Sequence, residues 1–212
     1  MDDGELAICD ENDFGFGWIA LEPALLQRAS HALVSGGRFW LVDPVDASGL
    51  EGRLRELGEP AGVIQLVDRH PRDCAPLAER LQVPHHRLPF GGVPGSPFEV
   101  RKVLSVPGWR EVALWWEDER VLVCTEALGT APYFRAPDEP LGVHPFLRPY
   151  QPRGLRDMAR GLTPGHVLVG HGEGIHGEEA AAALRRAVQG ARRAAPRWLR
   201  DQLSGTRQKE KR

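Results

Sequence analysis

The residues from Asp68 to Cys74 place acidic, basic and nucleophilic side chains in one short segment, Asp-Arg-His-Pro-Arg-Asp-Cys. Arg69 and Arg72 precede a thiol that stands at the expected start of a helix, and both surroundings lower the pKa of a cysteine. Cys74 is therefore a candidate nucleophile. The spacing fixes no general base beside it, and a small buried thiol is the commoner role of such a residue.

A second polar segment, His-Gly-Glu-Gly-Ile-His-Gly at residues 171–177, precedes another expected helix. A Gly-rich backbone followed by a helix N-terminus is typical of anion-binding loops. The segment lacks the Gly-Lys-Ser/Thr signature of a nucleotide site, and Glu173, Glu178 and Glu179 would repel phosphate. We therefore expect no nucleotide-binding loop here.

Other histidines divide into structural residues and one candidate for the site. His31 has Ala and Leu neighbours in an expected strand, which favours a hydrogen-bonded structural role. His85 and His86 are adjacent in the chain, so on a strand their rings point in different directions and do not ligate one ion together. His144 lies in a Pro-rich segment that could reach over a functional site.

The elements that position these residues begin with a predicted hairpin. Residues 29–34 and 38–42 flank a Ser-Gly-Gly connection, which predicts two antiparallel strands. Ser48 is a candidate cap for the helix that follows, and Gly58 is placed to end it. The inward face of that helix is predicted to carry Leu50, Leu54 and Leu57.

The charged segment itself follows a predicted buried strand. Residues 63–67 form a short apolar run rich in branched side chains, and they lead directly into residues 68–74. A helix is expected next, with Ala75, Leu77, Ala78 and Leu81 facing inward. This alternation of strands and helices predicts an α/β fold.

The middle of the chain is rich in short strands, predicted at residues 100–106, 111–116 and 120–125. Trp115 and Trp116 must point to opposite faces of their strand. We expect one of these rings in the core and the other under a Pro-rich segment or the C-terminal helix.

Residues 129–161 contain six prolines and little periodicity, which predicts a long ordered loop or lid. One more strand is predicted at residues 166–169. Glu178 and Glu179 then open a helix that Pro196 is expected to break or kink. Its apolar stripe is predicted at Leu184, Val188, Ala191, Ala195 and Trp198.

Four segments, in chain order, resemble motifs of the metallo-β-lactamase family. They are Phe39-Trp40-Leu41-Val42-Asp43-Pro44, Val67-Asp68-Arg69-His70-Pro71-Arg72-Asp73-Cys74, Val106-Pro107-Gly108-Trp109 and Val167-Leu168-Val169-Gly170-His171-Gly172. They are similar to the family's strand ending in Asp, its His-x-His-x-Asp-His turn, its Pro-Gly-His segment and its late Gly-His. The resemblance covers roughly residues 29–190, has a divergent, bacterial-type character, and implies a four-layer αββα sandwich.

The same resemblance implies a site for one or two zinc or iron ions, whose ligands are only partly present. If Asp73 matches the Asp of the turn, Arg69 and Pro71 occupy the first two His positions and Cys74 the third. Trp109 stands in place of the His of Pro-Gly-His, and Glu126 in place of the bridging Asp. Among the histidine positions of these motifs, His171 alone is unchanged.

These replacements lead to two hypotheses about function. The leading one is a fold that has lost the dinuclear hydrolase centre, binds no metal cofactor and keeps its cleft for a small ligand or for structure. A buried ion-pair network would then fill the space of the metal, with Arg69 and Arg72 matched to Asp73 and Glu126.

The alternative is a metal-dependent hydrolase of a small ester or thioester that uses a rearranged single-ion site for zinc or iron. It requires His70 to turn inward and join three other ligands, Asp73, Glu126 and His171. Under either hypothesis the cleft candidates are Arg69, His70, Arg72, Asp73, Cys74, Trp109, Glu126, His144 and His171.

The length of 212 residues suits one domain, predicted at residues 17–203, with an acidic flexible lead-in at 1–16 and a disordered basic tail at 204–212. The acidic start is unlike a secretory signal and no run is apolar enough to span a membrane, so we expect a soluble, cytoplasmic protein. Three widely spaced cysteines predict reduced thiols.

The net charge of −2 conceals an asymmetry. Residues 180–212 carry ten Lys or Arg against two acidic residues, or +8, which leaves −10 for the rest of the chain. A basic end can bind nucleic acid, although a solvated helix face explains the same charges and is the simpler interpretation.

Overall fold

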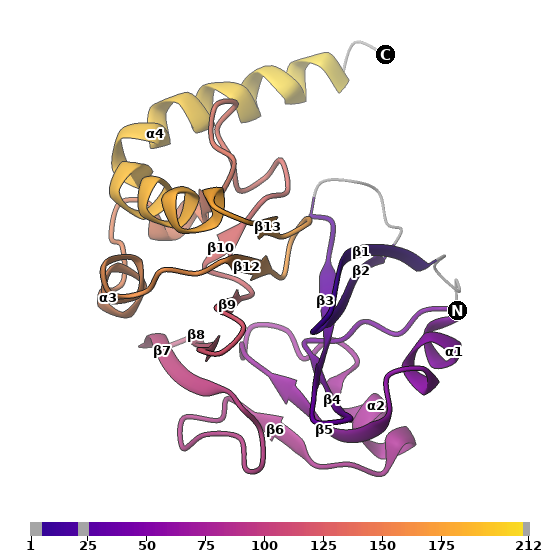
Figure 1. Cartoon of the computed structure of the whole chain (residues 1–212). Coiled ribbons are helices and arrows are strands. Elements are labelled where there is room, and N and C mark those ends of the chain that lie inside the picture. Colours follow the sequence, from indigo (N-terminus) through magenta and orange to yellow (C-terminus); the bar gives the residue numbers. More distant parts are fainter. Residues whose placement is uncertain (1–5, 21–25, 210–212) are drawn as a thin grey trace.

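The computed structural model describes residues 6–20 and 26–209, which form two β-sheets that pack face to face (Figure 1). The first sheet has the order β1 (Leu6–Asn12), β2 (Gly15–Ala20), β3 (Ala29–Ser35), β4 (Arg38–Val42), β5 (Glu59–Gln65) and β6 (His85–Arg87). The second has the order β13 (Ile175–His176), β12 (His166–Val169), β9 (Val121–Cys124), β8 (Trp109–Trp116) and β7 (Glu99–Val106). A small pair is formed by β10 (Leu128–Gly129) and β11 (Gly142–Val143).

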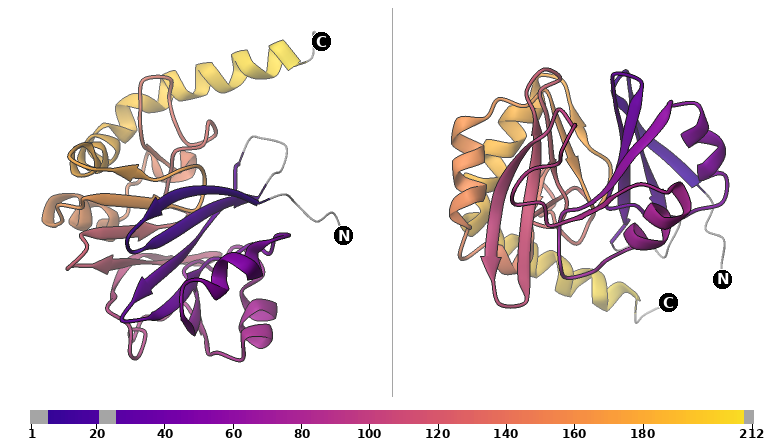
Figure 2. Two further views of the ribbon diagram at one scale, coloured as in Figure 1. Left: turned by 45° about the vertical axis from the view of Figure 1, so that its right-hand side comes forward. Right: turned by 90° about the horizontal axis from the view of Figure 1, so that it is seen from below.

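Helices cover the outer face of each sheet, as the right-hand view in Figure 2 shows. The first sheet carries α1 (Leu50–Arg55) and α2 (Cys74–Leu81), and the second carries α3 (Arg153–Gly161) and α4 (Glu179–Lys209). The short 3₁₀ helix η1 (Pro145–Leu147) lies between β11 and α3 in the chain. The order of layers is therefore α, β, β, α, as the sequence predicts.

Three apolar clusters fill the spaces between these four layers. Trp40, Ile64 and Trp116 belong to the cluster that joins the inner faces of the two sheets. Separate clusters join the first sheet to α1 and α2, and the second sheet to α3 and α4. Trp115 belongs to the last of these, so the two adjacent Trp rings lie on opposite faces of β8, as predicted.

The strands that matter for function end at one edge of the sandwich. In the first sheet β4, β5 and β6 run parallel, and in the second β9 and β12 run parallel. The loops that follow β5, β9 and β12 therefore leave the sheets at their carboxyl ends, where open α/β sheets commonly bind ligands. Val67 pairs with Glu111 and so joins the loop after β5 to the second sheet.

Several expectations about local structure are wrong. Residues 6–16 are not a loose lead-in, because Leu6–Asn12 forms β1 and β2 starts at Gly15, and together they extend the first sheet. Acidic side chains obscure the strand pattern there. Residues 129–161 are not one long loop, since the segment contains β11, η1 and α3. The cap of α1 is Gly49, with φ of 83°, rather than Ser48.

The C-terminal helix is also more continuous than expected. It continues past Pro196 and through most of the predicted tail to Lys209, although its course bends in Figure 1. A proline lacks the N–H that would bond one turn back, which accounts for a bend at this position without a break. Residues 1–5, 21–25 and 210–212 lie outside the described part of the chain.

No helix within residues 6–20 and 26–209 is both long and apolar enough to cross a membrane.

Candidate functional site

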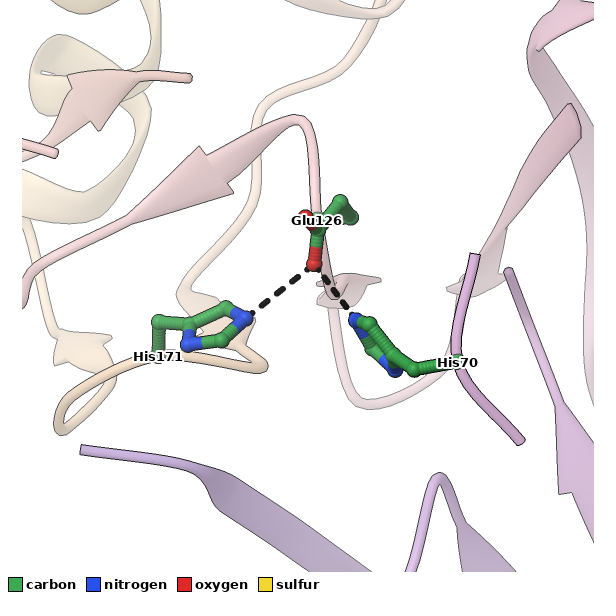
Figure 3. Close-up of side chains that lie close together, drawn as sticks. All are labelled: His70, Glu126 and His171. Atoms are coloured by element: carbon green, nitrogen blue, oxygen red, sulfur yellow. Dashed lines mark hydrogen bonds and ion pairs between the residues drawn. The ribbon is translucent and has the colours of Figure 1, made fainter. Parts of the chain in front are cut away.

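Three side chains from three different loops converge at the carboxyl-end edge of the sandwich (Figure 3). His70 follows β5, Glu126 follows β9 and His171 follows β12. Nε2 of His70 lies 2.8 Å from Oε2 of Glu126, and Nε2 of His171 lies 3.1 Å from the same oxygen. Each residue offers one atom that could bind a metal ion, and these three atoms lie within 4.8 Å of one another.

Close packing of β9 against β12 sets the position of two of these residues. Gly170 N donates to Thr125 O at 3.1 Å, and a Cβ on Gly170 would lie only 2.3 Å from that oxygen. Any other residue at this position would push the two loops apart. The glycine before His171 therefore has a direct steric cause, and it brings His171 within reach of Glu126.

The two ring nitrogens of His171 face two acceptors. Nδ1 lies 2.9 Å from Leu26 O, which can only accept, so Nδ1 carries a proton. Nε2 then presents a lone pair toward the carboxylate of Glu126, unless a cation lies between them or the ring is protonated twice. Phe134 stacks on this ring, with centroids 4.9 Å apart, and holds its orientation.

Glu126 is 6% exposed and lies among groups that are cationic or can become so. Burial opposes its ionisation, but the contacts with the His171 and His70 rings outweigh burial and hold the pKa of this carboxyl well below its usual range. Its second oxygen, Oε1, lies 3.8 Å from Nη1 of Arg69 and 3.7 Å from Nε2 of His144. Glu126 is therefore an anion at neutral pH.

His144 forms one wall of the site with a defined tautomer. Its Nδ1 accepts from Phe146 N at 3.3 Å at the start of η1, so Nε2 carries the proton and points toward Glu126. Burial lowers the pKa of His144 to about 4, so the ring is neutral. The prediction that His144 reaches over the site is consistent with this position.

Glu111 lies directly behind the site and was not predicted. It is fully buried on β8, where Oε1 accepts from the backbone N–H groups of Glu126 and Ala127 at 2.9 Å each. Oε2 accepts from Nε1 of Trp109 at 3.0 Å. Burial raises the pKa of Glu111 to about 7. A charged residue inside the apolar run Trp109–Trp116 was the available sequence signal.

The three side chains open into a cleft of about 660 Å³, a volume typical of small-molecule sites. Among the nine predicted cleft residues, seven line it: Arg69, His70, Arg72, Asp73, Glu126, His144 and His171. Trp109 lies one layer back, with the Arg69 guanidinium 4.4 Å from its ring centre. Leu26, Tyr133 and Phe134 add an apolar wall that sequence reasoning missed.

The predicted network of arginines and carboxylates is wrong for two of its four members. Arg72 donates to three backbone carbonyls, those of Ala29, Asp43 and Gly170, and thus joins the two sheets. Asp73 accepts from the backbone of Asp46 at 2.8 Å and stands at the N-terminus of α2, so it joins neither the network nor the ligand cluster. Arg72 and Asp73 each bond to backbone groups instead of to the side chains predicted as their partners.

Cys74 is not a nucleophile in this structure. The thiol is completely buried in the cluster under α2. Burial and the nearby Asp43 raise its pKa above the ordinary value, although Arg72 acts in the opposite direction. The alternative role, a small buried thiol, describes it. His31 is structural, as predicted, with Nε2 2.9 Å from Val169 O.

Comparison with known proteins addresses the fold. No family model and no curated protein matches the sequence. Among solved structures, TMB-1 superimposes with a TM-score of 0.56 at 13% identity, covering 88% of this chain and 98% of that chain. VMB-1 gives 0.55 at 12% identity, covering 89% and 98%, and the DIM-1 metallo-β-lactamase gives 0.50 at 12% identity, covering 88% and 98%. At such identities the likeness concerns the fold alone, and the chain is a metallo-β-lactamase-fold protein.

Proposed function

We propose that the cleft binds one divalent metal ion, zinc or iron, on His70, Glu126 and His171, and that the protein hydrolyses a small ester or thioester there. The observation that carries the proposal is the pair of contacts made by His171. A metal-bound histidine usually donates from one ring nitrogen to a carbonyl or carboxylate and binds the ion through the other, and His171 donates from Nδ1 to Leu26 O while Nε2 faces the proposed ion position beside Glu126.

The spacing of the donor atoms supports the same proposal. Two ligand atoms about 2.1 Å from one ion lie about 3.0 Å apart at a right angle and about 3.4 Å apart at the tetrahedral angle of zinc. The observed separations of 2.8 and 3.1 Å from Glu126 Oε2 are close to the first value and need to widen by about 0.3 to 0.6 Å for the second. Two histidines and one carboxylate with open positions are also an established ligand set for catalytic zinc and for iron.

A single ion, rather than two, is part of the proposal. Pro71 and Trp109 cannot ligate, and Asp73 is engaged by the backbone of Asp46. Within the described residues, His70, Glu126 and His171 form the one group of three or more potential ligands. The dinuclear centre of the fold is thus proposed to be lost, while a rearranged mononuclear site takes its place.

The bound ion would supply a water molecule with a pKa near 7 and would polarise a carbonyl oxygen. The chain's own residues would do the rest. His144 holds an N–H toward the cleft and can donate to the developing oxyanion. Leu26 and Phe134 provide an apolar surface for an acyl group, and Arg69, about a third exposed, can contact an anionic end of the substrate.

A metal-free ligand-binding cleft is the second candidate, and the position of Arg69 favours it. A guanidinium 3.8 Å from Glu126 would repel a divalent ion at the same carboxylate. A doubly protonated His171 would then replace the ion. The two candidates differ in what a chelator does to the protein.

Turnover before and after removal of metal distinguishes them. We expect hydrolysis of a panel of p-nitrophenyl esters and acyl thioesters to fall to background after dialysis against a chelator, and to return when one equivalent of zinc or iron is added. His86→Gln, at a half-buried histidine on β6, is the matched control and should behave like the native chain. Hydrolysis that a chelator leaves unchanged would refute the metal-dependent mechanism.

A further inference from the structure

A second group of histidines lies away from the cleft, on β12 and β13 of the second sheet, where Asp10 of β1 contacts His176. His166 and His176 stand directly opposite each other on the antiparallel strands β12 and β13. Their Nδ1 atoms lie 2.8 Å apart. A single proton fits between two nitrogens at this distance, and a metal ion would need the two rings to move apart.

The carboxylate of Asp10 determines which nitrogen of His176 carries a proton. Oδ1 of Asp10 lies 2.7 Å from Nε2 of His176 and also accepts from Gly174 N. The carboxylate of Asp10 faces two donors here, the ring nitrogen of His176 and Gly174 N, and accepts from both as an ionised carboxylate does. His176 therefore donates from Nε2 and presents a lone pair at Nδ1, toward His166.

His166 can present a second lone pair to the same point. Nδ1 of His166 faces the lone pair of His176 at 2.8 Å, and a metal ion that displaces the proton between the two nitrogens would meet a lone pair from each ring. Phe14 packs edge-on against this ring at 4.9 Å and fixes its orientation. Both rings are only half-buried, with about a third of the His176 side chain exposed, so an ion from solvent can reach them.

We infer that His166 and His176 form a binding site for a divalent transition-metal ion, Zn²⁺ by the chemistry of its ligands. Two imidazole nitrogens about 2.1 Å from one tetrahedral ion lie about 3.4 Å apart, so the rings, now 2.8 Å apart at Nδ1, need to separate by about 0.6 Å. Asp10 then orients His176 as the carboxylate of a carboxylate–histidine–metal arrangement. Water completes the coordination.

The ion would join parts of the chain that are distant in sequence. Asp10 belongs to β1 of the first sheet, and both histidines belong to the second sheet, just before α4. Binding would stabilise the contact between the sheets in proportion to the zinc concentration. This inference does not depend on the proposed function, because none of its residues lines the cleft at Glu126.

Calorimetric titration of the metal-free protein with Zn²⁺ at pH 7.5 tests the site. We expect a weaker class of binding beside the class at His171, and its affinity should fall at least about 10-fold in both His166→Gln and His176→Gln. Asp10→Asn should weaken it about 10-fold, as loss of an orienting carboxylate does. His86→Gln should leave it unchanged. Below pH 6 protonation of the rings should remove it.

Two controls keep the outcome interpretable. In His171→Ala the weaker class of Zn²⁺ binding should persist. If the native chain shows the weaker class but lacks the tighter one, the proposed hydrolase is contradicted and the site at His166 and His176 is not. Imidazole ¹⁵N NMR of the native chain should show Zn²⁺ at Nδ1 of two histidines, which needs no variant. A native chain without the weaker class, or one in which both substitutions leave that class unchanged, would overturn the inference.

Discussion

Replacement of Glu126 by glutamine should remove the metal ion and lower kcat/KM for ester or thioester hydrolysis by about 10³-fold. The amide keeps the shape of the side chain but not the negative charge that would balance the proposed divalent ion beside His70 and His171. A metal ion contributes several kcal/mol to transition-state stabilisation, and each 1.36 kcal/mol is a factor of about ten.

Metal content and turnover of Glu126→Gln need to be measured on the same preparation. Glu173→Gln is the matched control, because Glu173 is exposed in the loop after His171 and its carboxylate is not part of the ligand cluster. It should keep both metal and activity. Native-like turnover by Glu126→Gln would mean that the reaction takes place elsewhere in the molecule.

Replacement of Glu111 by leucine should destabilise the protein by about 3 to 5 kcal/mol. The change leaves four buried donors without an acceptor, namely the N–H groups of Glu126 and Ala127, the indole of Trp109 and the thiol of Cys124. Each buried donor that loses its partner costs about 1 to 3 kcal/mol. Because those backbone groups form the turn that carries Glu126, the metal site should be lost together with stability.

Urea unfolding of the metal-free protein measures this effect. Glu111→Gln is the informative partner variant, since its carbonyl oxygen can still accept from both backbone groups while it loses only the bond to the indole. We expect it to lose less than half as much stability as Glu111→Leu. Equal losses for the two variants would indicate that packing volume, rather than hydrogen bonding, determines the role of Glu111.

The fold was predictable where strands have a clear local pattern. The hairpin of β3 and β4, the buried strand β5 and the helix after it all follow from apolar spacing and glycine positions. The strand β1 was missed because Asp10 and Glu11 obscure its alternation, and Asp10 has a positive φ of 53° near a bulge. Asp10 contacts His176, more than 160 positions away in the chain, and such a contact has no local signature in the sequence.

The membership of the site was predictable in part and its pairing was not. Sequence reasoning named four candidate ligands, and the structure brings His70, Glu126 and His171 together but places Asp73 apart from them. It also expected Arg72 to pair with a carboxylate, whereas Arg72 binds carbonyls from both sheets. Backbone acceptors carry no signature in a sequence, so the partner of a buried arginine can be identified only once the strands are placed.

The number of metal ions bound per chain tests the single-ion centre most directly. Protein purified without chelator and passed through gel filtration should contain about one equivalent of zinc or iron. That equivalent should be absent from His171→Ala and present in His176→Gln, which separates the cleft from the second histidine site. A native chain with no bound metal would contradict the single-ion centre and support a cleft held together by protonated His171 and Arg69. Two equivalents of metal that both depend on His171 would contradict the loss of the dinuclear centre.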